Sequence, residues 1–253
     1  MSDPNATPPA APQAPAGVLT GPAYRDFVCA VLARKAARNY LEVGVHNGST
    51  LAKVECQAIG VDPAFVFDRN PVGRKRALHL YQMTSDEYFR DHDPRAIFGA
   101  PVDAAFLDGL HLFEYLLRDF INTERLCDRN SVIMIDDCLP RNIEMTERVH
   151  RAPLRQDKNL AGWWTGDVWK VISILREYRP DLRITPVDVQ PTGNMVVSNL
   201  DPSSTRLQDA YFEIVDRYSS VELDADGFDA YWAVNAPKPA AEVLESLSLH
   251  IRA

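Results

Sequence analysis

The stretch that decides the fold is Tyr40-Leu41-Glu42-Val43-Gly44-Val45-His46-Asn47-Gly48-Ser49-Thr50. A short, mostly apolar run ends at Gly44, and Gly48 follows just before the point where a helix is expected to begin. Two glycines at this spacing permit a tight turn and let the backbone come close to a ligand. The stretch therefore predicts a strand, a ligand-binding turn and a helix, in that order.

Similar apolar runs recur along the chain, at residues 58–61, 78–83, 104–107 and 132–135, with two closing strands at 183–189 and 194–199. Between the runs, the apolar residues of 24–31, 113–121 and 168–175 are spaced as on one face of a helix. Continuous apolar strands between amphipathic helices are typical of a parallel sheet that is covered on both faces. The predicted fold class is α/β, with a doubly wound, mainly parallel, seven-stranded Rossmann-like sheet.

The composition suits a soluble globular protein, since 46% of the 253 residues are hydrophobic and 25% are charged. A formal net charge of −8 argues against nucleic acid or an anionic membrane as the main partner, because both require phosphates to be neutralised. Residues 1–17 are nearly all Pro, Ala and small polar residues, which predicts a disordered tail before one domain at 18–253.

The sequence also predicts a cytoplasmic protein. No apolar run approaches the roughly 20 residues of a membrane span, and no basic start followed by an apolar stretch marks a secretory signal. The four cysteines lack the short spacing of a zinc site or a redox pair, so reduced thiols are expected.

Asp62 lies 18 residues after Gly44, at the end of the next predicted strand. A carboxylate there can accept hydrogen bonds from both hydroxyls of a ribose, which favours a nucleoside site over a simple turn with a loop aspartate. A dinucleotide is disfavoured because His46 and Asn47 stand where a glycine would let the backbone reach a pyrophosphate. Glu42 would repel a pyrophosphate but suits a cationic ligand.

A second group of acids follows the fourth and fifth predicted strands, with Asp108 after one and Asp136-Asp137 after the other. Because neighbouring strands lie about 4.8 Å apart, these carboxylates can converge on one hard divalent cation such as Mg²⁺. Asp136 and Asp137 can share an ion only if the strand has ended before them. The alternative is that one of the two is an ordinary turn or cap residue.

His111 is expected just before or within the first turn of the helix that follows Asp108. The positive end of the helix and a nearby cation should both depress the pKa of this histidine, leaving a neutral ring that can accept a proton. A structural histidine bonded to backbone at the helix start is the alternative. The other histidines, His46 and His150 among them, are expected to be structural or exposed.

The first motif resembles the class I S-adenosylmethionine-dependent methyltransferases, whose ExGxxxG pattern matches Glu42, Gly44 and Gly48, with Asp62 following. The resemblance implies that the glycine turn holds the methionine part of the cofactor, that Asp62 binds the ribose and that Glu42 lies near the methionine ammonium. Ser85 and Asp86, after the third strand, match the segment that lines the adenine.

The second motif resembles the metal-dependent O-methyltransferases, the group of catechol, caffeoyl-coenzyme A, macrolide-sugar and aminocoumarin-sugar methyltransferases. Asp136 follows Asp108 by 28 residues, as in that group, and His111 stands where the catechol enzymes place a lysine base, as in its DGxH variants. The resemblance implies Asp108, Asp136 and Asp137 as metal ligands and His111 as the catalytic base.

The expected cofactors are then S-adenosyl-L-methionine and Mg²⁺ or another hard divalent cation. The expected partner is a small-molecule hydroxyl acceptor, a sugar of a secondary metabolite or a catechol-like ring, with no nucleic acid or membrane; the sequence also allows a homo-oligomer. Three alternatives stay open at this point: a metal-independent N- or O-methyltransferase, a nicotinamide-dependent oxidoreductase and an inactive nucleoside-binding module.

Two further segments have no assigned role. Residues 139–162 are rich in Arg and Asn and are a candidate substrate lid. Residues 163–170 place three tryptophans, Trp163, Trp164 and Trp169, before a predicted helix. They allow an aromatic wall over a substrate, although a helix cap with tryptophans packed in the core is the favoured interpretation.

Overall fold

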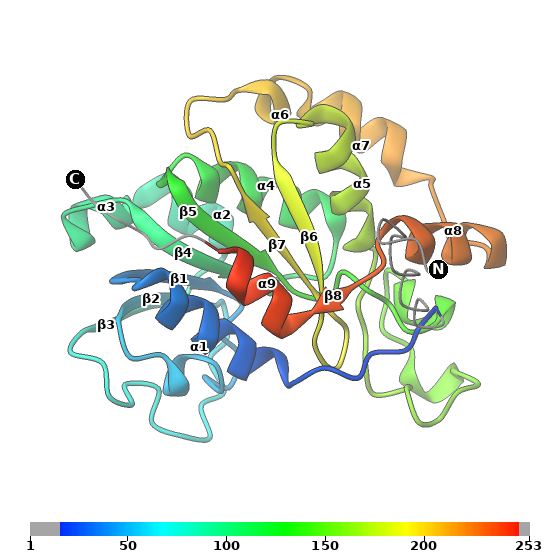
Figure 1. Cartoon of the computed structure of the whole chain (residues 1–253), viewed down its shortest axis with the longest axis horizontal. Coiled ribbons are helices and arrows are strands. Elements are labelled where there is room, and N and C mark those ends of the chain that lie inside the picture. Colours follow the sequence, from blue (N-terminus) through cyan, green and yellow to red (C-terminus); the bar gives the residue numbers. More distant parts are fainter. Residues whose placement is uncertain (1–15, 248–253) are drawn as a thin grey trace, which may run out of the picture.

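A computed structural model of the chain describes residues 16–247, and its centre is one mixed sheet (Figure 1). The strands are β1 (Asn39–Val43), β2 (Gln57–Val61), β3 (Leu78–Tyr81), β4 (Val102–Leu107), β5 (Cys127–Ile135), β6 (Arg183–Asp188), β7 (Asn194–Ser198) and β8 (Lys238–Pro239). Their order is β3-β2-β1-β4-β5-β7-β6-β8, and only β7 runs antiparallel to its neighbours. The prediction of seven strands missed β8, because two residues carry no periodic signal.

Helices cover both faces of the sheet, which confirms the doubly wound α/β class (Figure 1). The helices are α1 (Tyr24–Lys35), α2 (Ser85–Asp91), α3 (Pro94–Phe98), α4 (Phe113–Glu124), α5 (Trp169–Tyr178), α6 (Arg206–Asp209), α7 (Tyr211–Ser219), α8 (Ala225–Val234) and α9 (Ala240–Ser246), and the 3₁₀ turns are η1 (Leu51–Lys53), η2 (Ile143–Thr146) and η3 (Ala152–Leu154). Residues from α1 and α9 form the core on one face, and residues from α4 and α5 belong to the core on the other.

Successive residues of the central strands alternate between these two cores. In β1, Leu41 and Val43 join the core that contains α4, whereas Tyr40 joins the core that contains α1. All five residues of β1 are buried, since both faces of the sheet are covered. This double burial explains the continuous apolar run that the sequence shows there.

The order of the strands places a crevice at the carboxyl ends of β1 and β4. From β1 the chain proceeds to β2 and β3 on one side of the sheet, and it then returns to β4 on the other side of β1. Ligands of open α/β sheets bind outside the strand ends at such a reversal.

The helix that was predicted after Gly48 is not formed, and the single turn η1 stands in its place. Lys75 is buried, and its ammonium group donates hydrogen bonds to the carbonyls of Leu51, Pro71 and Val72. The Leu51 carbonyl also accepts the Val54 N–H, which closes the turn, and Val54 itself is extended. The chain therefore leaves the helical path after three residues.

Some predictions concern the chain as a whole. Residues 1–15 of the predicted tail 1–17 lie outside the described residues. Within residues 16–247, no helix has the length and apolar character needed to cross a lipid bilayer. All four cysteines are free thiols, as expected.

Candidate active site

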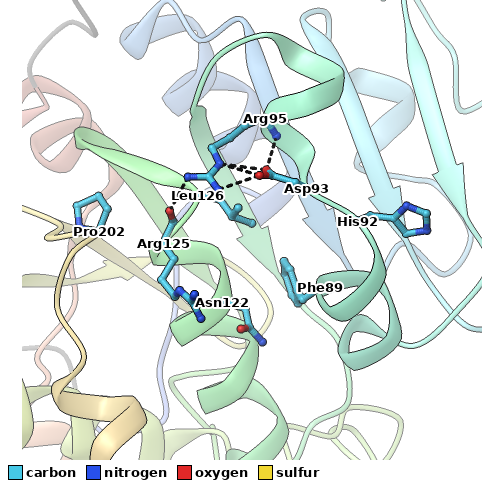
Figure 2. Close-up of a pocket in the computed structure, with 8 residues that line it drawn as sticks. All are labelled: Phe89, His92, Asp93, Arg95, Asn122, Arg125, Leu126 and Pro202. Carbon is cyan, nitrogen blue, oxygen red and sulfur yellow. Dashed lines mark hydrogen bonds and ion pairs between the residues drawn. The ribbon is translucent and has the colours of Figure 1, made fainter.

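A cavity of about 720 Å³ lies where the strands β1 to β5 end. Its lining comes from the segments that follow these strands, from Tyr24 of α1, and from residues 150, 162–164 and 191–192. Figure 2 shows a different cavity of about 360 Å³, between α3 and the end of α4, where the Arg95 guanidinium is already neutralised by Asp93 at 2.8 Å. The larger cavity occupies the position that the sheet topology favours for a ligand.

Gly44 brings the ends of β1 and β4 together at the cavity. Its φ is +87°, and a Cβ atom there would lie 1.7 Å from the carbonyl oxygen of Asp108, so only glycine fits. Gly48 closes the turn with its N–H on the Val45 carbonyl, but it does not border the cavity. Gly48 shapes the turn, and its predicted contact with a cofactor stays a prediction.

Asp62, at the end of β2, fixes the loop that follows β1. Its carboxylate accepts the backbone N–H of His46 at 2.7 Å and that of Ala64 at 2.8 Å. His46 has a positive φ of +49°, so it takes the left-handed conformation that glycine adopts most easily. Both side chains border the cavity, and His46 is exposed there, as expected.

Glu42 does not border the cavity, and its predicted place near a methionine ammonium stays a prediction. Its side chain is on the same face of β1 as Tyr40, because residues two apart in a strand share a face. It accepts a hydrogen bond from the Tyr40 hydroxyl at 2.8 Å, and burial raises the pKa of Glu42 to about 8. Glu42 is thus a fully buried acid, and the charge of Asp108 adds to the rise of its pKa.

Ser85 and Asp86 begin α2 and border the cavity at the end of β3. Asp86 forms an ion pair with Arg118 of α4, at 2.6 Å. The helical pattern of α4 predicts that Asp119 points outward, but this side chain is only 2% exposed and borders the same cavity. The reason is that α2 packs against α4 and covers a face that an isolated amphipathic helix would expose to water.

Asp119 is therefore a cavity residue that the sequence did not reveal. Its Oδ1 atom has no hydrogen-bond partner among the described residues. Burial raises the pKa of Asp119 to about 7, although a hydrogen bond from Ser85 opposes the shift.

The acids after β4 and β5 meet His111 at the centre of the cavity. Asp137 comes after the end of β5 and has a φ of +58°, so the condition that the strand has ended is met. One ligand atom from each of Asp108, His111 and Asp137 lies within 4.8 Å of the others, as a single metal ion would require. Asp136 borders the cavity too, but its Oδ1 already accepts the Asn194 amide at 2.6 Å and the Asp137 N–H at 2.9 Å.

The imidazole of His111 is held on both of its nitrogens. Nδ1 lies 2.7 Å from the carbonyl oxygen of Trp164 and 3.1 Å from Asp137 Oδ2, and Nε2 lies 3.6 Å from Asp108 Oδ1. A carbonyl oxygen can only accept, so Nδ1 carries a proton and Nε2 is the nitrogen available for proton exchange.

In the absence of a cation, the pKa of His111 is raised rather than depressed. Burial lowers the pKa, but the carboxylates of Asp137 and Asp108 outweigh this effect and raise the pKa to about 10. Burial also raises the pKa of Asp137 to about 6 and that of Asp136 well above its usual value, with Asp108 adding to both. The prediction assumed a nearby cation, whose charge would act on His111 in the opposite direction.

Two of the three tryptophans form part of the wall, and the third belongs to the core. Trp163 is 47% exposed and borders the cavity, as does Trp164, whose ring is stacked between His111 and His150. Trp169 is buried against Tyr231. Core packing therefore holds only for Trp169, whose helix has no side-chain cap. His150 is exposed, as expected, and also borders the cavity.

The cap in this segment serves another helix. Asp167 accepts the backbone N–H of Phe113, the first residue of α4, at 2.9 Å. Gly166 has a φ of +56°, and a Cβ there would lie 1.8 Å from the His111 carbonyl oxygen. Residues 166–167 thus pack directly on the chain that carries His111.

Comparison with known proteins gives one family match, since residues 27–138 match the sequence model described as "Methyltransferase domain". A search among curated proteins found no match. Two solved structures with similar folds are the O-methyltransferase from Bacillus cereus in complex with SAH (14% identity, 72% of this chain and 83% of that chain, TM-score 0.45) and the O-methyltransferase TomG from Streptomyces achromogenes, involved in tomaymycin synthesis, in complex with SAM (17% identity, 71% of this chain and 81% of that chain, TM-score 0.48).

Proposed function

We propose that this chain is a class I S-adenosylmethionine-dependent methyltransferase, as the match of residues 27–138 to a methyltransferase domain supports, and that it methylates a hydroxyl group of a small molecule with the help of a divalent cation. The observation that carries the proposal is the convergence of Asp108, His111 and Asp137 in the cavity that Gly44 and Asp62 also border. Removal of a proton from a hydroxyl group requires a base beside the cofactor, and His111, held by the two carboxylates, can serve as that base.

The cofactor would occupy the part of the cavity beside β1 to β3. Gly44 allows the backbone to approach the methionine part, and Asp62, fixed by two backbone N–H groups, would bind the ribose. Ser85 and Asp86 border the region where the base would lie. Glu42 and Gly48 would act through the fold, because neither borders the cavity.

The residues present fit a hard divalent cation. Asp108 and Asp137 offer oxygen atoms, which Mg²⁺ prefers, and three mutually repelling acids in one buried place give a cation a physical reason to bind. When bound, it would polarise the acceptor hydroxyl and offset the negative charge that raises the pKa of His111. Asp136 would orient Asp137, whose N–H it already accepts.

His111 would accept the proton of the acceptor hydroxyl on Nε2, since Nδ1 is engaged by Trp164 and Asp137. As the new O–C bond forms, the C–S bond of the sulfonium breaks and its electron pair stays on sulfur. The products are a methyl ether and S-adenosylhomocysteine. Much of the rate would come from holding oxygen and methyl at near-attack distance.

One observation favours a second candidate, a metal-independent N- or O-methyltransferase. His111 in its charged form lies between Asp108 and Asp137 and can itself neutralise part of their charge. In that case the aspartates orient the histidine, and no cation is needed.

Transfer of a labelled methyl group from S-adenosylmethionine to catechols and glycosides, after EDTA treatment and after Mg²⁺ is restored, tests the proposal. We expect activity to be lost with EDTA, recovered with Mg²⁺, and lost in Asp108→Asn, while the surface variant Asp209→Asn keeps it. Full activity in EDTA would support the second candidate instead. Absence of methyl transfer to every hydroxyl acceptor would contradict the proposed acceptor class.

A further inference from the structure

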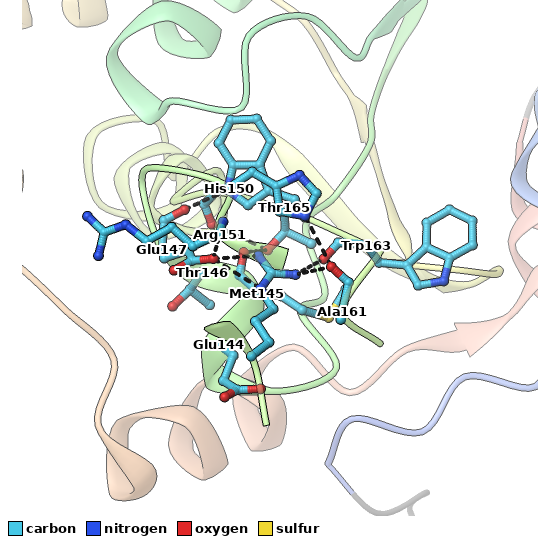
Figure 3. Close-up of polar contacts among 12 residues, drawn as sticks. Glu144, Met145, Thr146, Glu147, His150, Arg151, Ala161, Trp163 and Thr165 are labelled. Carbon is cyan, nitrogen blue, oxygen red and sulfur yellow. Dashed lines mark hydrogen bonds and ion pairs between the residues drawn. The ribbon is translucent and has the colours of Figure 1, made fainter. Parts of the chain in front are cut away.

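Residues 144–165, between β5 and α5, are folded around one buried arginine, Arg155. This side chain is only 3% exposed, although it carries a full charge. Nε and Nη2 donate to Glu147 Oε1 at 3.0 and 2.9 Å, and Nη1 donates to the carbonyls of Ala161, at 3.3 Å, and Trp163. Figure 3 shows Glu147, Ala161 and Trp163 drawn together by these contacts. The arginine therefore ties the beginning of the segment to its end.

The two ends that Arg155 joins determine where Trp164 lies. The indole Nε1 of Trp164 donates to the Glu147 carbonyl at 2.6 Å, so the side chain is attached to the same residue that pairs with Arg155. The main chain of Trp164 follows directly after the Trp163 carbonyl that Arg155 binds. Arg155 thus holds Glu147, to which the ring of Trp164 is bonded, and Trp163, which precedes Trp164 in the main chain.

Trp164 is in turn the residue that holds His111. Its carbonyl oxygen accepts from Nδ1 of His111 at 2.7 Å, and its ring stacks on the imidazole with 4.9 Å between centroids and 23° between planes. These two contacts fix both the position of the imidazole and the direction in which Nε2 points.

We propose that Arg155 is a positioning residue for methyl transfer: through Glu147 and Trp164 it holds the imidazole of His111 so that Nε2 faces the acceptor. The inference rests on the proposed function for its catalytic consequence. The structural part, that Arg155 sets the hydrogen bond between Trp164 and His111, does not depend on it.

The test compares Arg155→Met and Arg155→Lys with the control Arg151→Met, which changes an exposed arginine of the same segment. The first measurement is the NMR signal of the Nδ1 proton of His111, assigned by its absence in His111→Gln. We expect exchange of this proton with water to be about tenfold faster in Arg155→Met, intermediate in Arg155→Lys and unchanged in Arg151→Met.

The second measurement separates kcat from cofactor affinity. In Arg155→Met we expect kcat to fall about tenfold, the effect of losing one orienting hydrogen bond. Calorimetric affinity for S-adenosylhomocysteine should stay within about twofold, because Gly44 and Asp62 lie outside the segment. Arg155→Lys should recover part of kcat, since an ammonium can pair with Glu147 but cannot serve all three acceptors.

If Arg155→Met does not fold, Trp164→Phe keeps the test decisive. It removes the bond from Nε1 to the Glu147 carbonyl and leaves a smaller ring to stack on His111, and the same faster exchange is expected. An unchanged Nδ1 signal in Trp164→Phe and in Arg155→Lys would overturn the inference. Faster exchange without methyl transfer by the parent chain to any hydroxyl would support the positioning role and contradict the proposed function, so the two failures are distinguishable.

Discussion

Replacing Asp119 by asparagine should make the protein more stable at neutral and alkaline pH. Asp119 is a fully buried acid in α4 that borders the cavity, and its Oδ1 has no hydrogen-bond partner among the described residues. Burial raises the pKa of this carboxyl from its usual 3.8 to about 7. Asparagine has nearly the same shape and never ionises, so the Asp119→Asn variant isolates the cost of the buried charge.

The sign and size of the effect follow from the pKa shift. Between pH 3.8 and pH 7 the folded parent holds a proton that the unfolded chain has released, so the free energy of unfolding falls as pH rises through this window. About three pKa units at about 1.36 kcal/mol each give a loss of about 4 kcal/mol, complete above pH 7 and absent below pH 4. Asp119→Asn carries no ionisable group at this position, so its free energy of unfolding does not suffer this loss.

Urea unfolding of the parent and of Asp119→Asn at several pH values between about 4 and 8 measures the difference. We expect the stability advantage of the variant to grow with pH and to level off above pH 7. The control Asp91→Asn changes an exposed acid that pairs with Arg90, and its difference from the parent should not grow in the same window. A parent–variant difference that stays constant from acid to alkaline pH would refute the reasoning about Asp119.

Three further changes have direct readouts. Asp62→Ala removes the carboxylate that accepts the His46 N–H. Calorimetry should show that S-adenosylhomocysteine binds about tenfold to a hundredfold more weakly, which is the range for a charged hydrogen bond. Unchanged affinity would argue against a contact between Asp62 and the ribose. Gly44→Ala places a Cβ 1.7 Å from a carbonyl oxygen at a φ of +87°, so a lower Tm and lost cofactor binding are expected, and a parent-like Tm would contradict the close approach of the two strand ends. Arg179→Met leaves Glu124 buried and without its charge partner, which should lower the free energy of unfolding by about 3–5 kcal/mol in urea titrations; a loss below about 1 kcal/mol would show that this pair is solvated.

The sequence predicted the sheet well because each central strand is buried on both faces. Continuous apolar runs identify such strands, but the same continuity hides which face a given residue occupies. Glu42 illustrates the limit: every residue of β1 is buried, so the pattern does not show that the Glu42 carboxylate shares a face with Tyr40 and accepts its hydroxyl. Only the packing of the helices on the two faces decides this.

The meeting of Asp108, His111 and Asp137 could be anticipated, because the ends of adjacent parallel strands share one edge. The direction of the His111 pKa could not, since it depends on distances of 3.1 and 3.6 Å to two carboxylates that spacing along the chain does not give. The helical pattern of α4 predicts that Asp119 faces solvent for a related reason. Periodicity describes one helix and takes no account of a second helix packed across it.

Residues 144–167, which follow β5, were the least predictable part of the site. Their contacts indicate that cofactor binding and the positioning of His111 depend on different parts of the chain. The strand ends supply Gly44 and Asp62, which are fixed by neighbouring backbone and would hold the cofactor. Residues 144–167 supply Trp164, which contacts the imidazole of His111, and Asp167, which caps the helix after it. Substitutions in the first group should therefore change the affinity for the nucleoside, and substitutions in the second should change turnover at constant affinity. This separation follows from contacts between residues about fifty positions apart in the chain, which no local pattern encodes.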